Sequence, residues 1–384
     1  MTQARTLSSL VGSMARQGVD KPNVHPIVIN GDLMVNNHRV VNNTLTGLGD
    51  SDEGYVIHDR LRHTITAGAG RYTAASTAVT DLTGFGTCLH LDCTTAESSL
   101  ATSGSIFNID YRVEANDIAS LLNWSDTSND TSAKYITVSF YMKTNKAFKF
   151  TTGFINSDNS RHIRKEFTTG TDWTRHVLSF GPDIGNSPNS DFGEGLRWRT
   201  TISAGSDFTS GTLATDWEST TNANAHTSNT PNNFFDSTDN DIKMTGLQME
   251  IGQYTSDNIP DFQKMDLATE RRRCDRYCQL LAHGQDQVMG NASSYSATRI
   301  VLDYCQRGTF RNTPTIVQSG LSNSIRFDRD NSFDLFDSFS GVQFGHVNGI
   351  GLEGATGVST SIAKYAYVYG ASDSDTRVLM LAEL

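Results

Sequence analysis

The chain is poor in charged and in apolar residues. Charged residues make up 19% of its 384 residues and hydrophobic residues 37%, against roughly 25% and 45–50% in ordinary globular domains. A disordered chain would need high charge and few aromatic side chains, yet this one has 19 Phe, 12 Tyr and 4 Trp, enough to fill a core. With only 7 Pro, and with 32 Gly that follow no period of three, collagen is also excluded.

Long apolar runs are missing as well. No run reaches the roughly 18 residues of a membrane span, and Met1–Gly18 lacks the continuous apolar segment of a secretory signal. We therefore expect no membrane insertion. The net charge is −11, and a duplex-binding protein would need a basic face, so we expect no nucleic-acid partner.

Cysteine is scarce and its count is odd, which argues against a disulfide framework and favours assembly in a reducing cytoplasm. The five cysteines are Cys88, Cys93, Cys274, Cys278 and Cys305. Cys274 and Cys278 could supply two zinc ligands from one helix face, but four well-spaced ligands are needed. A buried apolar stripe explains the same residues, and we expect no metal there.

The polar remainder is broken by short runs of alternating residues. In Tyr135–Lys143 the residues Ile136, Val138, Phe140 and Met142 point one way and polar residues the other. Many such strands with one polar face indicate antiparallel sheets. The sequence predicts an all-β protein, with an antiparallel jelly-roll or β-sandwich domain over 25–265 and a smaller C-terminal β domain within 266–384.

Two segments have helical periodicity. In 3–16, Leu7, Leu10, Val11 and Met14 form one apolar stripe. A helix this short is marginal alone, so it docks either on its own domain or on another protein. Residues 1–24 are expected to form this docking helix and a hinge. A second helix is expected from Asp266 to about His283, linking the two β domains, with Asp266 as its cap.

Motifs for catalysis are absent. The sequence has neither GxSxG nor HExxH, and Gly349–Gly354 matches GxGxxG without the βαβ context that a dinucleotide site needs. We therefore expect no enzyme and no cofactor. Asp328–Asp334 resembles half of a calcium loop but lacks the glycine and the closing glutamate; structural calcium stays open beside the alternative of solvated turns.

Two tryptophans are candidates for glycan binding. Trp124 lies in a polar loop and Trp217 follows another. An exposed indole beside hydrogen-bonding neighbours can stack on the apolar face of a pyranose ring. The alternative is that these side chains pack in the core or between subunits.

The order of several segments resembles that in a group of bacteriophage and prophage virion proteins of the tail fibre type, which have a jelly roll like that of carbohydrate-binding modules. The segments begin with INGDLMVN at Ile29–Asn36 and YVIHDRL at Tyr55–Leu61. They continue with ITVSFYMK at Ile136–Lys143, GLQMEIG at Gly246–Gly252 and ERRRCDRYCQ at Glu270–Gln279, and the chain ends in LAEL. None of these segments is a catalytic or ligand-contact motif in that group.

The resemblance implies a structural protein of a phage virion appendage, assembled in the host cytoplasm and involved in host attachment or glycan recognition. Its expected partners are other virion proteins, through the stripe Leu7, Leu10, Val11 and Met14, and host surface glycan. The resemblance and the unburied apolar stripes also favour a homotrimer. A capsid-mounted fibre or head decoration protein is the alternative, followed by a glycan-degrading enzyme.

Overall fold

The computed structural model describes residues 26–39, 43–66, 68–97, 103–125, 132–227, 233–283, 287–296, 299–304, 307–319, 325–329, 332–346, 349–354, 365–370 and 377–384. They form two compact units. Unit 1 holds the described residues of Met1–Met34, Thr44–Val56 and Leu61–Met265; unit 2 holds those of Val35–Asn43, Ile57–Arg60 and Asp266–Leu384. The predicted helix with Leu7, Leu10, Val11 and Met14 lies outside the described residues.

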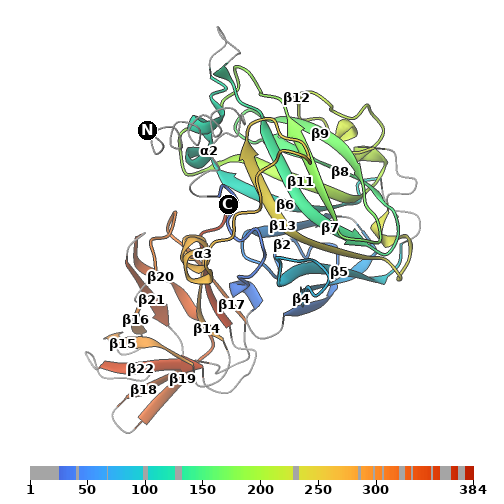
Figure 1. Cartoon of the computed structure of the whole chain (residues 1–384). Helices are drawn as coiled ribbons and strands as arrows, with labels where there is room; N and C mark the ends of the chain where they lie inside the picture. Colours follow the sequence, from blue (N-terminus) through green and yellow to red (C-terminus); the bar gives the residue numbers. More distant parts are fainter. Residues whose placement is uncertain are drawn as a thin grey trace, which may run out of the picture. The chain divides into compact units, whose positions relative to one another are not determined.

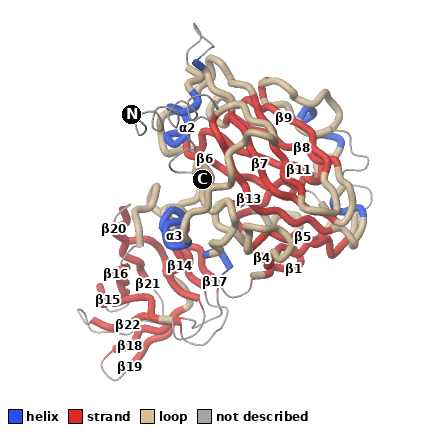
Figure 2. The backbone as a smooth tube through the Cα atoms, in the orientation of Figure 1, coloured by secondary structure: helices blue, strands red, loops and turns tan. Residues whose placement is uncertain are grey.

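Unit 1 contains two antiparallel sheets (Figures 1 and 2). The six-stranded sheet has, in spatial order, β1 (Thr44–Leu48), β4 (Arg71–Ala78), β5 (Thr87–Thr95), β13 (Asp241–Ile251), β7 (Ile136–Thr144) and β10 (Thr174–Phe180). The seven-stranded sheet has β12 (Glu218–Ser219), β9 (Arg161–Thr168), β8 (Lys149–Asn156), β11 (Glu194–Ala204), β6 (Ile106–Glu114), β3 (Leu61–Thr66) and β2 (Gly54–Tyr55). The connections of unit 1 include helix α2 (Ala115–Leu122) and the short 3-10 helices η3 (Ser206–Phe208), η4 (Asn222–Asn224) and η5 (Phe234–Asp236).

The core of unit 1 lies between these sheets. Phe140 on β7 is fully buried, with its ring centroid 5.4 Å from that of Trp198 on β11 and 5.2 Å from that of Phe167 on β9. Phe154 on β8 and Phe180 on β10 make a further contact, with centroids 5.2 Å apart. Aromatic side chains from both sheets therefore meet face to face, which defines a β-sandwich. The alternation in Tyr135–Lys143 predicted this inner face correctly.

Unit 2 is also built from antiparallel strands. A three-stranded sheet has β14 (Cys278–His283), β23 (Arg377–Leu381) and β17 (Thr315–Ser319). A seven-stranded sheet has β19 (Ser332–Phe336), β18 (Ile325–Arg329), β22 (Tyr365–Gly370), β15 (Val288–Ser296), β16 (Arg299–Tyr304), β21 (Gly349–Gly354) and β20 (Phe339–His346). The unit also contains the 3-10 helix η1 (Asn37–Arg39) and helix α3 (Leu267–Cys274). The predicted all-β class, with a second β domain at the C-terminal end, is confirmed.

The helix predicted from Asp266 to about His283 is wrong in its second half. Asp266 caps α3 as expected, because its side chain accepts a hydrogen bond from the Thr269 amide. The helix ends at Cys274, and the chain enters β14 at Cys278, which pairs with Leu381 of β23. Pairing with a distant strand outweighs the local helical periodicity of the apolar residues. No helix among the described residues is long and apolar enough to cross a membrane.

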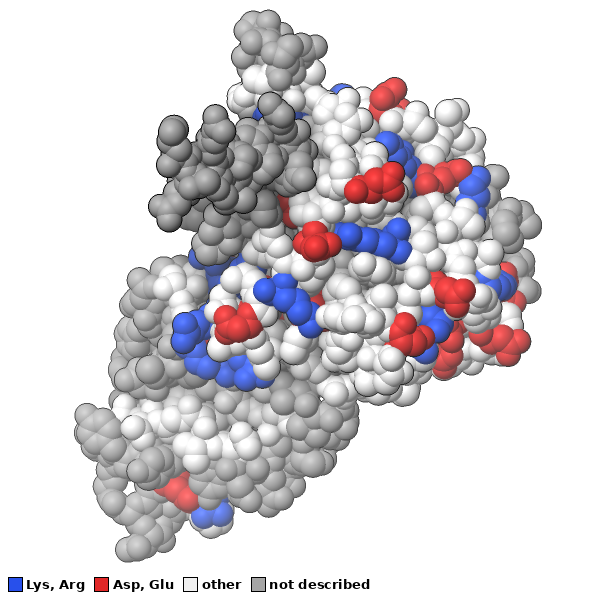
Figure 3. All heavy atoms as spheres, in the orientation of Figure 1, with Lys and Arg blue, Asp and Glu red and all other residues white. Residues whose placement is uncertain are grey.

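The arginines of α3 point to solvent. Arg271 and Arg272 are exposed and Arg273 is half-buried, which fits the simplest interpretation of this face as a solvated surface. Figure 3 shows basic side chains gathered over α3, whereas acidic and basic side chains are interspersed over the visible part of unit 1.

Candidate functional site

The outer face of the seven-stranded sheet of unit 1 carries three rows of side chains. Directly paired residues of antiparallel strands share a face. The first row is Arg62, Asp110, Arg199, Gly153 and Arg164. The second row is Thr64, Asn108, Thr201, Thr151 and Glu166. The third row is Arg112, Arg197, Ile155, His162 and Glu218. We call these rows the charged face. Its opposite side is the aromatic core, because side chains alternate along each strand.

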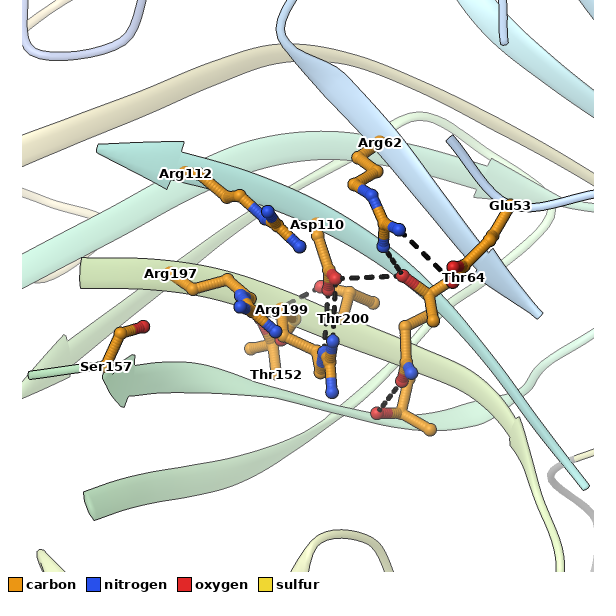
Figure 4. A network of polar contacts seen from close by, with 12 residues as sticks. Glu53, Arg62, Thr64, Asp110, Arg112, Thr152, Ser157, Arg197, Arg199 and Thr200 are labelled. Carbon is orange, nitrogen blue, oxygen red and sulfur yellow. Dashed lines mark hydrogen bonds and ion pairs between the residues drawn. The ribbon is translucent and has the colours of Figure 1, made fainter. Parts of the chain in front are cut away.

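Asp110 is the centre of the first row (Figure 4). Arg199 donates two hydrogen bonds to its carboxylate, both 2.7 Å long, and the Thr64 hydroxyl donates a third of 3.1 Å. Burial alone would raise the pKa of Asp110, but the charge and hydrogen bonds of Arg199 outweigh it and hold this pKa below its ordinary value. The carboxylate is therefore ionised at neutral pH and fixes the Arg199 guanidinium in one orientation.

Glu194, at the start of β11, organises the arginines of the third row. Its carboxylate lies 3.0 Å from Nε of Arg112 and accepts a 2.8 Å hydrogen bond from Nε of Arg197. The Ser157 hydroxyl also donates to it. The side chains of Arg112 and Arg197 are 16% and 22% exposed. Their positions are set by the protein while part of each still reaches solvent (Figure 4).

A face of this kind suits hydroxyl-rich or anionic ligands. Guanidinium groups are planar donors and carboxylates are acceptors, and here each is held by the other. Arg62 follows the same rule, because its Nη2 lies 3.2 Å from Oε2 of Glu53. Binding to prearranged groups loses little conformational entropy. The charged face is therefore our candidate functional site.

The structure corrects the candidate platform at Trp124. This side chain is fully buried, and its indole N–H donates to the Lys134 carbonyl at 2.8 Å. The Trp217 ring packs edge-on against it, with centroids 5.4 Å apart. A ring in the interior cannot stack on a sugar, so the prediction of Trp124 as an exposed platform is wrong. The neighbouring apolar residues, Leu121 and Leu122, were the signal for burial. Trp217 is half-buried and stays a candidate.

Other sequence motifs take structural places. Asp328 and Asp334 belong to the two strands of the β18–β19 hairpin rather than to one loop, and Asp328 accepts a 2.8 Å hydrogen bond from Arg326. Gly349–Gly354 is strand β21, which fits the interpretation that it is no dinucleotide loop. The acid Glu218 contacts His162 at 3.2 Å, outside any arrangement of paired carboxylates that the structure records.

Unit 2 contains a buried polar cluster that brings several sequence motifs together. We call it the end network; its members are His38, Asp59, Arg60, Cys278 and Glu383. Arg60 pairs with Glu383, and His38 Nε2 lies 3.6 Å from the same carboxylate. The Arg60 guanidinium also stacks on the Tyr277 ring, 3.5 Å from its centroid. Glu383 belongs to the terminal LAEL segment and Asp59–Arg60 to YVIHDRL, so these motifs meet in space.

One ligand atom each from His38, Asp59 and Cys278 lies within 4.8 Å of the other two, which is close enough for one metal ion. Two observations oppose a cation there. The Asp59 carboxylate already accepts a 2.7 Å hydrogen bond from Asn37, and the Arg60 guanidinium lies within the same network. Burial and the Asp59 carboxylate raise the pKa of the Cys278 thiol well above its ordinary value, so the thiol is neutral. The cluster is best described as a structural network.

The sequence contained part of the charged face. The polar residues of β6 alternate with its apolar ones, which predicts a polar outer face for that strand. Which strands flank β6 depends on pairings such as Arg199 with Asp110, 89 residues apart, and no local pattern contains that information.

Comparison with known proteins gives likenesses of fold alone. No protein-family model matches the chain, and no curated protein matches it. The enzymatically active domain of tailspike protein 4 of bacteriophage CBA120 is 11% identical, with a TM-score of 0.28; the match covers 59% of this chain and 21% of that one. A family 4 carbohydrate-binding module is 8% identical, with a TM-score of 0.26 and coverage of 58% and 97%.

A family 11 carbohydrate-binding module of Clostridium thermocellum is 10% identical, with a TM-score of 0.25 and coverage of 60% and 96%. The proteins matched are thus carbohydrate-binding modules and a tailspike domain. The sandwich of unit 1 is a fold of the carbohydrate-binding-module type.

Proposed function

We propose that this chain is a non-enzymatic component of a phage virion appendage of the tail fibre type, and that it binds host surface glycan through the charged face. The observation that carries the proposal is the arginine–carboxylate network of that face. Arg112 and Arg197 are fixed by Glu194 and still partly exposed, so they can donate to sugar hydroxyls without first being ordered.

The virion role is supported by the order of the sequence segments that resemble those of phage tail fibre proteins. The end network adds a physical reason for three of them, because YVIHDRL, ERRRCDRYCQ and LAEL supply Arg60, Tyr277 and Glu383. These segments stabilise unit 2. The ligand-binding role belongs to different residues, on the sheet of unit 1.

The proposal is tested with a glycan array followed by calorimetry on the glycans that bind. Arg197→Ala removes a partly exposed donor of the charged face and should weaken binding about tenfold, the loss of one charge-assisted hydrogen bond. The matched control is Arg272→Ala, which removes an exposed arginine of α3 in unit 2. Equal affinity for wild type and Arg197→Ala would overturn the assignment of the face.

The virion role needs a separate experiment. Electron microscopy of particles labelled with an antibody to the chain should place it on the tail. Label on the capsid would favour a head decoration protein or capsid-mounted fibre, and no label would overturn the virion role.

A further inference from the structure

Arg164 and Arg199 lie in the same row of the charged face with a glycine between them. The register pairs Arg199 with Gly153 on β8 and Gly153 with Arg164 on β9. Neighbouring strands are about 4.8 Å apart, so the two arginine backbones stand roughly 10 Å from each other. Gly153 puts no side chain into the space between them, and a Cβ there would lie 1.9 Å from the Ile163 carbonyl oxygen.

Arg164 differs from the other arginines of this face. It is only 2% exposed, and its Nε and Nη1 have no hydrogen-bond partner. Among the described residues, no carboxylate oxygen lies within 4.0 Å of its guanidinium, whereas Arg62, Arg112, Arg197 and Arg199 each contact one. Burial, together with the charge of Arg199, lowers the pKa of Arg164 to about 9, which leaves it charged at neutral pH.

Two neighbouring groups also lack partners. The Thr151 hydroxyl, two residues before Gly153 on β8, is buried without a hydrogen bond, as are both ring nitrogens of His226. Burial, then the charges of Arg164 and Lys149, lower the pKa of His226 to about 3, so its ring is neutral and offers one N–H. All three side chains can donate a hydrogen bond that no protein atom accepts.

Such an arrangement is strongly unfavourable by itself. A buried charge is ordinarily paired, and buried polar atoms without partners are few in native proteins, where an ion or ligand often accounts for them. The complement of several donors and one positive charge is an anion with more than one acceptor oxygen. A carboxylate fits, because its two oxygens match the guanidinium fork.

We propose that the charged face binds an acidic glycan, and that the carboxylate of a uronic or sialic acid residue occupies the space over Gly153, where it accepts hydrogen bonds from Arg164, Thr151 and His226. This inference rests on the proposed glycan-binding function. The sugar ring would then lie beside the third row, where Ile155 is half-buried and Arg197 partly exposed. The Arg164 amide donates to the Ala214 carbonyl at 2.6 Å, so the segment around Ala214 moves aside when the ligand enters.

The test compares each acidic sugar with its own methyl ester, which keeps the ring and removes the charge. The probes are oligosaccharides that contain glucuronate, galacturonate or sialate, measured by calorimetry at neutral pH beside their esters. Wild type should bind at least one acid about tenfold or more tightly than its ester. Arg164→Met should abolish that difference and leave the affinity for the ester unchanged. Arg197→Met, the control from the same face, should weaken both.

The outcomes separate the two proposals. Equal binding of acid and ester by wild type overturns the acidic specificity and leaves glycan binding intact. Binding of no sugar overturns both proposals. A shift of the thermal midpoint by acetate or chloride alone, with no preference for acidic sugars, shows a small-anion site and overturns the assignment to a glycan.

Stability gives a second measurement. Because Arg164 has no partner in the protein, Arg164→Met should keep or raise the thermal midpoint in the absence of ligand. Arg199→Met, which strands the Asp110 carboxylate, should lower it. A marked fall for Arg164→Met would show that the guanidinium is needed for folding and would overturn the inference.

Discussion

Arg199 and Arg164 show how one residue type takes different roles in one row of a sheet. Arg199 and Asp110 hold each other through two hydrogen bonds. The removal of one partner from such a buried pair typically costs about 3–5 kcal/mol, because the remaining charge is stranded. Arg164 has no such partner. The first arginine therefore serves stability and the second is available to a ligand.

Trp124→Ala should lower the free energy of unfolding by about 3–5 kcal/mol, the typical cost of truncating a large buried aromatic side chain. The side chain is fully buried, and its indole N–H satisfies the Lys134 carbonyl. Urea denaturation would measure the loss. Trp173→Ala is the control, since this half-buried indole donates to Asp81 at an exposed position and should change stability far less. A small effect at Trp124 would contradict the packing described above.

Asp59 should make the stability of the chain depend on pH. Burial raises its pKa to about 6, although His38 and the hydrogen bond from Asn37 act in the opposite direction and Glu383 adds to the rise. In the unfolded chain this pKa is about 3.9. The folded state then binds a proton more tightly, so stability falls as pH rises from 4 to 6, by about 3 kcal/mol in total.

The measurement is a series of urea denaturations between pH 4 and pH 7 on wild type and Asp59→Asn. The wild type should lose stability relative to the variant as pH rises through this window, because asparagine does not titrate. His38, Arg60 and Glu383 face Asp59 in both proteins, so their titration largely cancels in the difference. Parallel curves would show that Asp59 is not held in a raised state.

At the scale of elements, local patterns predicted strands better than helices. The period-two alternation in Tyr135–Lys143 identified the buried face of β7, where Ile136, Val138, Phe140 and Met142 are all fully buried. At Cys274–Leu281 the apolar spacing fitted a helix, yet Leu267 on the same stripe is 41% exposed. The chain turns into β14 because Cys278 pairs with Leu381, more than a hundred residues away. Pairing at that distance leaves no mark in a local window.

Cys274 and Cys278 end α3 and begin β14, and both side chains are fully buried. The double change to Asp should cost several kcal/mol, because an unpaired buried charge is expensive. The double change to Ala should cost much less, since each thiol acts as a small apolar group. Elemental analysis of the wild-type protein is the companion measurement. We expect no bound zinc, and one equivalent that the alanine variant loses would contradict this expectation.

At the scale of the whole molecule, the two units divide the work. Unit 1 presents the charged face, and unit 2 closes around the end network, where Glu383 of the terminal LAEL segment meets Arg60 and His38. Sequence order alone did not show that Val35–Asn43 and Ile57–Arg60 belong with the C-terminal strands. Because these segments are far apart in the chain, only their shared buried contacts reveal the grouping.

Residues 1–22 should attach the chain to another component of the virion. The apolar stripe of Leu7, Leu10, Val11 and Met14 precedes the GVDKP segment, which has the composition of a hinge. An apolar stripe on so short a helix gains stability only by docking. A chain that lacks residues 1–22 should therefore fold with an unchanged thermal midpoint and fail to join particles, as measured by its copy number in purified virions. The control replaces the four stripe residues with serine in the full-length chain and should fail in the same way. Incorporation of the truncated chain at normal copy number would place the attachment surface elsewhere.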